Sequence, residues 1–170
     1  SINNAGELVG SHTFGSATEL VSATVSDNRI FAGWSTKMNA SFHEAKMTLD
    51  AFEIKGNTTL YAVWVFDWNE EKQAYEIGSE RDMILLSGLV SRRIEAISEI
   101  DFASLSYIQT ADMNFYLFET GLTPIGNELR PFTGTYDGQE FNIVFGLYTE
   151  KDRAGLFEYI DGATIKNVVI

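Results

Sequence analysis

The 170-residue chain contains no cysteine. Disulfide bonds, thiol nucleophiles and cysteine-ligated zinc are therefore excluded. Histidine is nearly as scarce, because His12 and His43 are the only two, and both lie in the N-terminal part. A catalytic triad needs three groups that converge on one point. We expect both histidines to be solvated or packed, and we predict no catalytic residues.

Basic residues are few: Lys and Arg total 12 against 24 for Asp and Glu, which gives a formal net charge of −12. Binding to a phosphate backbone requires clustered cations. The densest basic cluster is the pair Arg92-Arg93, and no glycine-rich phosphate loop is present. The composition therefore argues against nucleic acid as a partner and against adsorption to an anionic membrane.

Long apolar runs are also absent. A membrane-spanning helix needs about 20 apolar residues, whereas the most compact apolar cluster, "MILLSGLV", is interrupted by Ser87 and Gly88. We therefore predict no membrane insertion within the chain. No signal peptide is visible, and the chain stops on "VVI" in the middle of a strand pattern. Unprotected strand edges invite pairing, so we expect a fragment of a longer, truncated protein.

The sequence gives little support for a metal site or for a catalytic pair of carboxylates. The chain has no His-Glu-x-x-His and no Asp-x-Asp-x-Asp-Gly calcium loop, so no metal or cofactor is predicted. A loose calcium site built from Asp152 and Asp161 remains an open alternative. The pairs Glu70-Glu71 and Glu99 with Asp101 could suggest a glycosidase, which needs two carboxylates about 5 to 9 Å apart. We expect these pairs to be solvated surface instead.

Residues 1–66 are β-rich, with strand-like runs at "HTFG", "ELVSATV", "IFAGWS" and "TLYAVWVF". Apolar residues occupy both alternating faces of "TTLYAVWVF", which predicts a strand covered on both sides. The stretch "FHEAKMTLDAF" fits either a short helix or an irregular crossing. Residues 67–75, within the acidic stretch "DWNEEKQAYEIGSE", are interpreted as a linker between two domains.

The stretch "SERDMILLSGLVSRRIEAIS" contains the best helix candidate. Ser79 can cap the helix, with Asp82 three residues later. Four apolar residues then share one face at helical spacing: Met83, Leu86, Leu89 and Val90. Gly88 costs about 1 kcal/mol relative to alanine, which favours a helix of only three turns.

From Ser106 onward, glycine-punctuated strand patterns recur every 8 to 12 residues or so, which is typical of a sandwich, a barrel or a solenoid. In "PFTGTYDGQEFNIVFG", Asp137-Gly138 lies between two apolar runs. Asp-Gly is a favoured centre of a two-residue hairpin turn. Local propensity alone therefore predicts a hairpin here.

Residues 30–64, "IFAGWSTKMNASFHEAKMTLDAFEIKGNTTLYAVW", resemble the B-repeat of internalin-type bacterial surface proteins. The resemblance rests on an aromatic-x-Gly-Trp run followed by a Thr-Thr-Leu-Tyr-Ala-x-Trp strand. The motif residues are Gly33, Trp34, Leu60, Tyr61 and Trp64. The resemblance implies that residues 1–66 form a small β-grasp-like module, with Trp34 and Trp64 in its core.

Residues 107–170 resemble the GLUG-containing right-handed β-helix segments of bacterial adhesins. The matching pieces follow the family's order: Asp112, Pro124-Ile125-Gly126, Phe132 to Gly138, Ala154 to Phe157 and Ala163 to Val168. Within these pieces the motif residues are Pro124, Ile125, Gly126, Gly134, Asp137, Gly138, Gly155, Leu156 and Phe157. Glu158 departs from the pattern, because it stands where the family has glycine.

This second resemblance implies that residues 76–170 are the N-terminal cap and first coils of a parallel β-helix. "YEIGSERDMILLSGLV" resembles the strand and helix that precede such coils. The resemblance also makes Asp137-Gly138 a corner between stacked parallel strands, in conflict with the hairpin that propensity predicts. We follow the resemblance on this point.

Together these patterns indicate a non-catalytic module of an exported bacterial cell-surface protein, with a role in adhesion or in display as part of a stalk. The expected partner is a host or cell-surface protein or a glycan. Two alternatives stay open. The chain is the front end of a surface protease or polysaccharide-degrading enzyme, or it is a carbohydrate-binding module in which Trp68 contacts the sugar.

Overall fold

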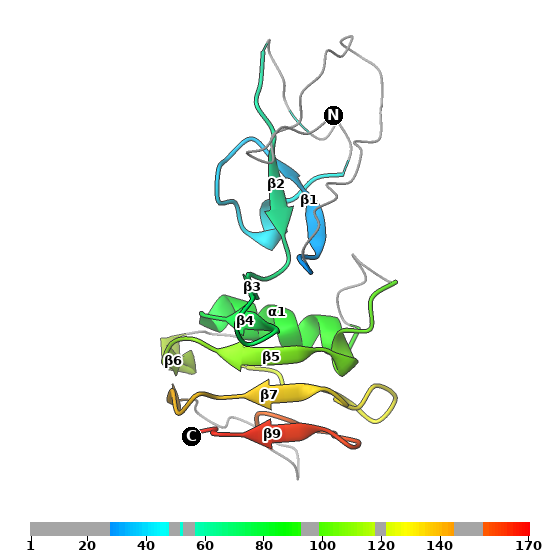
Figure 1. Ribbon diagram of the computed structural model, residues 1–170, viewed down its shortest axis with the longest axis vertical. Coiled ribbons are helices and arrows are strands. Elements are labelled where there is room, and N and C mark those ends of the chain that lie inside the picture. The colour runs from blue at the N-terminus through cyan, green and yellow to red at the C-terminus, as the bar shows by residue number, and fades with distance from the viewer. Residues whose placement is uncertain (1–27, 48–51, 53–56, 93–98, 118–121, 145–154) are drawn as a thin grey trace. The chain divides into compact units, whose positions relative to one another are not determined.

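The computed structural model describes residues 28–47, 52, 57–92, 99–117, 122–144 and 155–170 (Figure 1). The protein is mainly β, as predicted, with one α-helix in the described ranges. The chain divides into two compact units, Ser1–Val65 and Phe66–Ile170. The expected strands at "HTFG" and "ELVSATV" lie outside the described residues.

In the first unit, strand β1 (Phe31–Ser35) pairs antiparallel with β2 (Tyr61–Trp64), with an irregularity in register between Phe31 and Gly33. Between them, "FHEAKMTLDAF" begins with a short 3-10 helix, η1 (Phe42–Glu44). The Glu44 carboxylate accepts a hydrogen bond of 3.1 Å from the Ser41 backbone N–H, which satisfies a donor at the start of this turn.

The described core of the first unit is centred on Trp34 and Leu60, both buried. Trp34 is fully buried, as predicted. Trp64 is only half-buried, and the Arg29 guanidinium lies 4.6 Å from its ring centroid. Leu60 and Val63 face opposite sides of the β2 segment, and both are buried. Both faces of this strand are therefore covered in part, as the apolar alternation predicted.

The second unit begins with an antiparallel hairpin of β3 (Trp68–Asn69) and β4 (Ala74–Ile77). Residues 67–75, expected to be a linker, contain β3 and the start of β4, so they belong to the sheet of this unit. The sequence of this stretch is polar because the tip of the hairpin is exposed, and this polarity suggested a linker. Ala74 and Tyr75, in contrast, are buried.

Helix α1 (Glu80–Val90) confirms the predicted helix of three turns. The Ser79 hydroxyl oxygen accepts a hydrogen bond of 3.2 Å from the Asp82 backbone N–H, so the predicted cap is present. The four predicted apolar residues are all buried, and so are Leu85, Ser87 and Gly88. The buried Ser87 hydroxyl lies within hydrogen-bond distance of the carbonyl oxygens of Thr123 (2.6 Å) and Pro124 (3.0 Å).

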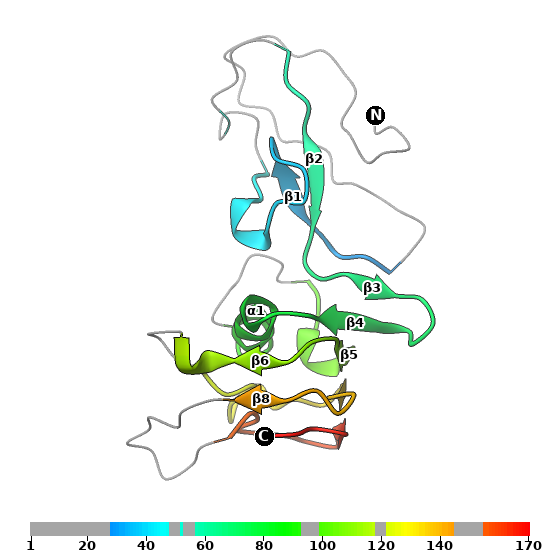
Figure 2. The same cartoon turned by 90° about the vertical axis from the view of Figure 1, so that its left-hand side faces the viewer.

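Four parallel strands form most of a five-stranded sheet, ordered β3-β4-β5-β7-β9. The parallel strands are β4, β5 (Ser106–Gln109), β7 (Thr135–Asp137) and β9 (Thr164–Lys166). A second parallel pair joins β6 (Met113–Asn114) to β8 (Ile143–Val144). Short 3-10 helices, η3 (Phe102–Ser104) and η4 (Phe115–Leu117), precede β5 and follow β6. Figures 1 and 2 show α1 on the side of β5 and β6 that faces away from β7 and β8.

The hairpin that propensity predicted at Asp137-Gly138 is wrong. Strand β7 pairs with β5 and β9, whereas β8, the next strand along the chain, pairs with β6 in another sheet. The connection is therefore a corner between two sheets. Its tight turn lies two residues later than predicted, because the Phe141 N–H donates to the Gly138 carbonyl at 2.9 Å. The central residues of this turn are Gln139 (φ 49°) and Glu140 (φ 64°).

Candidate functional site

Successive passes of the chain are joined by hydrogen bonds and parallel bridges between residues 27 to 32 positions apart. Three hydrogen bonds each link residues 30 positions apart: Thr133 Oγ1 to the Ala103 carbonyl (3.2 Å), Asn142 N–H to Asp112 Oδ1 (2.7 Å), and Asn167 Nδ2 to Asp137 Oδ1 (2.9 Å). Isolated parallel bridges add to the stack, at Ile125 with Phe157, Phe132 with Ile160, and Asn142 with Val169. Each pass therefore lies directly beside the next.

An aromatic column runs along one side of this stack. The register aligns Tyr75 with Tyr107, Tyr107 with Tyr136, and Tyr136 with Ile165. Tyr107 and Tyr136 are completely buried. Their hydroxyls are satisfied, because Tyr107 donates to the Phe102 carbonyl at 2.7 Å and Tyr136 donates to Gln109 Oε1 at 3.1 Å. Burial raises the pKa of both phenols, since the charged phenolate would be poorly solvated.

A buried amide completes this polar core. Gln109 is fully buried, and its Nε2 group donates to the Ala111 carbonyl at 2.9 Å while its oxygen accepts from Tyr136. Buried polar groups are costly unless they are hydrogen-bonded. Gln109 therefore favours the single alignment in which the Tyr136 hydroxyl meets its oxygen.

The opposite face of the same strands carries a row formed by Glu76, Ile108, Asp137 and Lys166. Asp137 Oδ1 accepts from the Gln139 N–H (3.1 Å) as well as from Asn167, and Oδ2 pairs with Lys166 Nζ at 3.1 Å. Burial raises the pKa of Asp137, but the hydrogen bonds from Asn167, Gln139 and Lys166 together outweigh it and hold this pKa below its ordinary value. Asp137 is therefore an ionised link between β7 and β9.

Three of the predicted motif glycines lie where backbones meet. A Cβ atom on Gly134 would collide with the Leu105 carbonyl oxygen, and one on Gly138 with the Asn167 carbonyl oxygen. Gly126 has φ +81°, and a Cβ there would meet the Tyr159 carbonyl oxygen. Side chains at these positions would push adjacent passes apart. The glycines therefore set the close spacing of the stack.

The Pro124-Ile125-Gly126 segment meets the Gly155-Leu156-Phe157 segment in parallel. Ile125 is completely buried, its N–H donates to the Leu156 carbonyl at 2.8 Å, and its carbonyl accepts from the Glu158 N–H at 2.9 Å. Gly126 occupies the left-handed region, whereas Glu158 does not. The turn at Glu158 therefore differs from the equivalent turn at Gly126, at the position where the sequence departs from the GLUG pattern.

Trp68, the weak candidate for ligand contact, packs within its own unit. Its ring meets Tyr75 edge to face, with centroids 4.9 Å apart. The indole Nε1 is buried and has no hydrogen-bond partner. Trp68 is half-buried, so this geometry leaves only part of the ring for stacking on a sugar.

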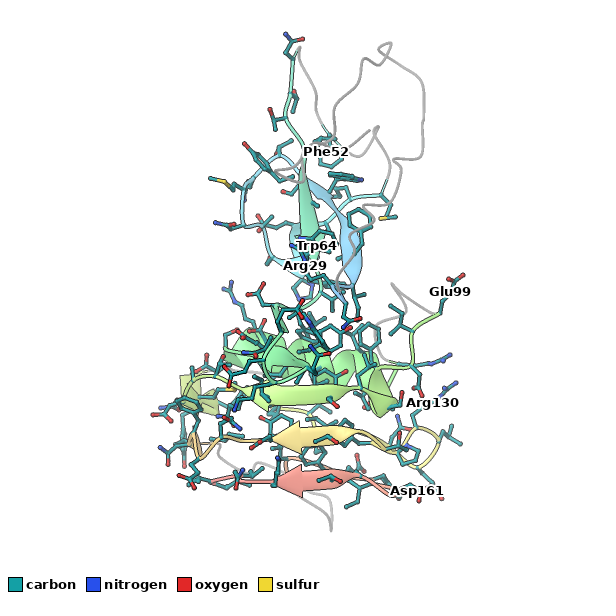
Figure 3. The ribbon with its side chains drawn as sticks, viewed as in Figure 1. Arg29, Phe52, Trp64, Glu99, Arg130 and Asp161 are labelled. Atoms are coloured by element: carbon teal, nitrogen blue, oxygen red, sulfur yellow. The ribbon has the colours of Figure 1, made fainter. Side chains whose placement is uncertain are left out.

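The candidate acid and metal groups do not converge in the described part of the chain. Among the described residues, no group of three or more His, Cys, Asp or Glu side chains could hold a metal ion. Glu70, Glu71, Glu99, Asp101 and Asp161 are all exposed. Figure 3 shows Glu99, Arg130 and Asp161 at successive levels along one side of the second unit. His12 and Asp152 lie outside the described residues.

His43 lies in η1, with its ring packed edge to face against Phe42 at a centroid distance of 5.6 Å.

No helix in the described ranges has the length and apolar character that a membrane span requires.

Sequence reasoning missed Gln109, Lys166 and Asn167, which hold the alignment of the strands. The sequence did contain a signal for these residues, because an acidic residue and an asparagine 30 positions later occur twice, as Asp112 with Asn142 and as Asp137 with Asn167.

Comparison with protein-family models, with curated proteins and with solved structures gives no match. The arrangement is a stack of parallel strands held by buried tyrosines, an ionised carboxylate and close-packed glycines.

Proposed function

We propose that this chain is a non-catalytic module of an exported bacterial surface protein, acting in adhesion or in display as part of a stalk. In this proposal residues 76–170 are the helix-capped start of a right-handed parallel β-helix, and residues 1–66 are a β-grasp-like B-repeat module. The supporting observation is the parallel alignment of β4, β5, β7 and β9, with side-chain links 30 residues apart.

A stack of this kind suits a mechanical role. Each pass is bound to its neighbours along its length, so each added pass contributes its own interface to the stability of the stack, without a large globular core. The Asp137 link and the glycine contacts at Gly134 and Gly138 both lie between adjacent passes. These interactions resist sliding of one strand past the next, which is what a spacer exposed to external force requires.

Export to the cell surface is tested by antibody labelling of the source cells. Antibodies raised against the recombinant chain are applied to intact cells and to permeabilised cells, with a cytosolic protein as the control antigen. We expect labelling of intact cells with this antibody and not with the control. Labelling that appears only after permeabilisation would contradict the proposal.

Adhesion and display are separated by a bead assay. Beads coated with the chain are applied to host cells and to immobilised glycans, beside beads coated with the Gly134→Ala variant as a weakened-fold control. Attachment that depends on the intact fold supports adhesion. Equal attachment of both beads, or none, leaves display and spacing as the role.

A further inference from the structure

The dipeptide Asp-Gly occurs twice in the chain, at Asp137-Gly138 and at Asp161-Gly162. In this dipeptide the main-chain nitrogen of the glycine can attack the carboxyl carbon of the aspartate and close a five-membered imide ring. Glycine favours the attack because it has no Cβ atom to block the approach and adopts a wide range of backbone angles. Both positions therefore carry the same intrinsic reactivity, and their surroundings decide whether the ring forms.

The first pair, Asp137-Gly138, is held at both reacting groups. The Gly138 N–H donates to the Lys166 carbonyl at 2.9 Å. Asp137 Oδ1 accepts hydrogen bonds from Gln139 and Asn167, and Oδ2 pairs with Lys166 Nζ. Attack of the Gly138 nitrogen on the carboxyl carbon would require both groups to leave these partners. The folded structure therefore protects this pair.

The second pair, Asp161-Gly162, lies in a bulge. Phe132 bridges to Ile160, and Thr135 pairs with Thr164. Two residues lie between Phe132 and Thr135, whereas three lie between Ile160 and Thr164. The later pass therefore has one extra residue at this corner, and the extra residue of a bulge is left out of the ladder of hydrogen bonds.

Both reacting groups of this second pair are open. Gly162 has φ +67°, and a Cβ atom built on it would meet nothing within 4 Å. Within the described ranges, the Gly162 N–H donates no backbone hydrogen bond, and the exposed Asp161 carboxylate has no hydrogen-bond or ion-pair partner. Figure 3 shows the Asp161 side chain along one side of the second unit. Thr133 occupies this corner in the preceding pass and is exposed although the pass of Asp161 lies beside it. The corner is therefore open even where another pass follows.

We propose that Asp161 is a site of spontaneous modification, at which the folded chain forms isoaspartate. The Gly162 nitrogen bonds to Asp161 Cγ, and a hydroxyl group of the carboxyl leaves with the amide proton as water. Water then adds to the imide ring. Addition at Cγ restores aspartate, whereas addition at the main-chain carbonyl breaks the original peptide bond and leaves the chain running through Cγ. The water released equals the water consumed, so the step needs no other reactant.

Isoaspartate at this corner should loosen the start of β9. The Asp161 N–H donates to the Phe132 carbonyl and the Thr164 N–H donates to the Gly134 carbonyl, each at 2.9 Å. A chain that runs through Cγ has one more backbone atom between these two bonds, and it carries a free carboxylate on the Cα atom. Because the two bonds are set for the original length, we expect the Thr164 amide to exchange with solvent faster after the modification.

The test compares the two Asp-Gly pairs within one molecule and does not depend on the proposed cell-surface role. The full chain is incubated in mildly acidic buffer at physiological temperature, and isoaspartate is measured at intervals by mass-spectrometric peptide mapping. A modified peptide keeps its mass, elutes separately and resists a protease that cleaves at aspartate. We expect isoaspartate at Asp161 to accumulate at least roughly 10-fold faster than at Asp137, whose reaction first requires charge-assisted hydrogen bonds to break.

Two controls separate the structural cause from the sequence. In urea that unfolds the chain, the rates at Asp161 and Asp137 should become similar, because only the shared dipeptide then matters. Asp161→Glu keeps the exposed charge but would need a six-membered ring, which closes far more slowly, so the tryptic peptide 154–166 of this variant should stay unmodified. Incubation of this variant should also leave the exchange of the Thr164 amide unchanged.

Equal rates at the two positions of the folded chain would overturn the proposal, as would faster reaction at Asp137. Isoaspartate that forms at Asp161 only in urea would also overturn it, because the folded corner would then hold the reacting groups apart. If the Thr164 amide speeds up equally in the incubated Asp161→Glu variant, the loosening of β9 has another cause and that part of the inference is wrong.

Discussion

The side-chain amide of Asn167 donates a hydrogen bond of 2.9 Å to the Asp137 carboxylate, 30 positions earlier in the chain. The same carboxylate pairs with Lys166 at 3.1 Å. Two consecutive residues at the end of β9 therefore bind one carboxylate at the end of β7. The charge state of Asp137 is thus coupled to the attachment of β9.

This coupling predicts acid sensitivity. Because the folded-state pKa of Asp137 lies below its ordinary value, the stability that it contributes is present above about pH 4 and is lost as the pH falls through the lowered pKa. Asp137→Asn should therefore flatten the fall in urea midpoint on acidification. Asp161→Asn, at an exposed carboxylate, is the control and should leave the slope unchanged. Equal slopes for all three proteins would contradict the prediction.

Alkaline stability should depend on Tyr107. Burial raises the pKa of this phenol well above its ordinary value, so the neutral form is favoured in the folded state. Its contribution is complete below about pH 10 and is lost as the pH rises further. The stability of the Tyr107→Phe variant should fall less steeply as the pH rises, although this variant loses the hydrogen bond to the Phe102 carbonyl. Tyr116→Phe, at an exposed tyrosine, should behave like the unmodified chain when thermal unfolding is followed.

Gly134→Ala should destabilise the second unit by about 3 kcal/mol, because the added methyl group would collide with the Leu105 carbonyl and neither backbone can move freely. Gly155→Ala is the matched control, since its Cβ would come no closer than 3.4 Å to the Phe157 carbonyl oxygen. Urea unfolding measures both variants. Similar losses of stability in the two would show that Gly134 does not set the strand spacing.

The turn at Gln139 and Glu140 should be improved by glycine. Both residues adopt left-handed backbone angles, which cost roughly 1–2 kcal/mol each for residues with a Cβ atom. Allowing for the greater unfolded-state entropy of glycine, Gln139→Gly should raise the free energy of unfolding by about 0.5–1 kcal/mol. Glu128→Gly, at a turn residue without a left-handed angle, should lower it. A loss of stability in Gln139→Gly would argue against strain at this corner.

Local features of the fold could be predicted from the sequence. The Ser79 cap and the three-turn helix depend on residues within a few positions of one another, and the mainly-β composition depends on residue type. Burial of Trp34 followed from its size in a small unit. These interactions require no knowledge of distant partners.

Strand partners could not be predicted from propensity, because each pairing joins residues about one pass apart. The Asp137-Gly138 pair illustrates the difficulty. Its local preference favours a hairpin, but contacts with Leu105, Lys166 and Asn167 hold the segment in a parallel stack. Gly138 is required for close approach to Asn167 rather than for a left-handed angle. The resemblance anticipated the corner, but the residues that bind across it became visible only in the structure.

Helix α1 covers the end of the stack formed by β5 and β6. Strands β5 and β7 each have a parallel neighbour on both sides, so the release of either strand requires two ladders to break. The backbone amides of β5 and β7 should therefore exchange with solvent more slowly than those at the exposed tip of the β3–β4 hairpin.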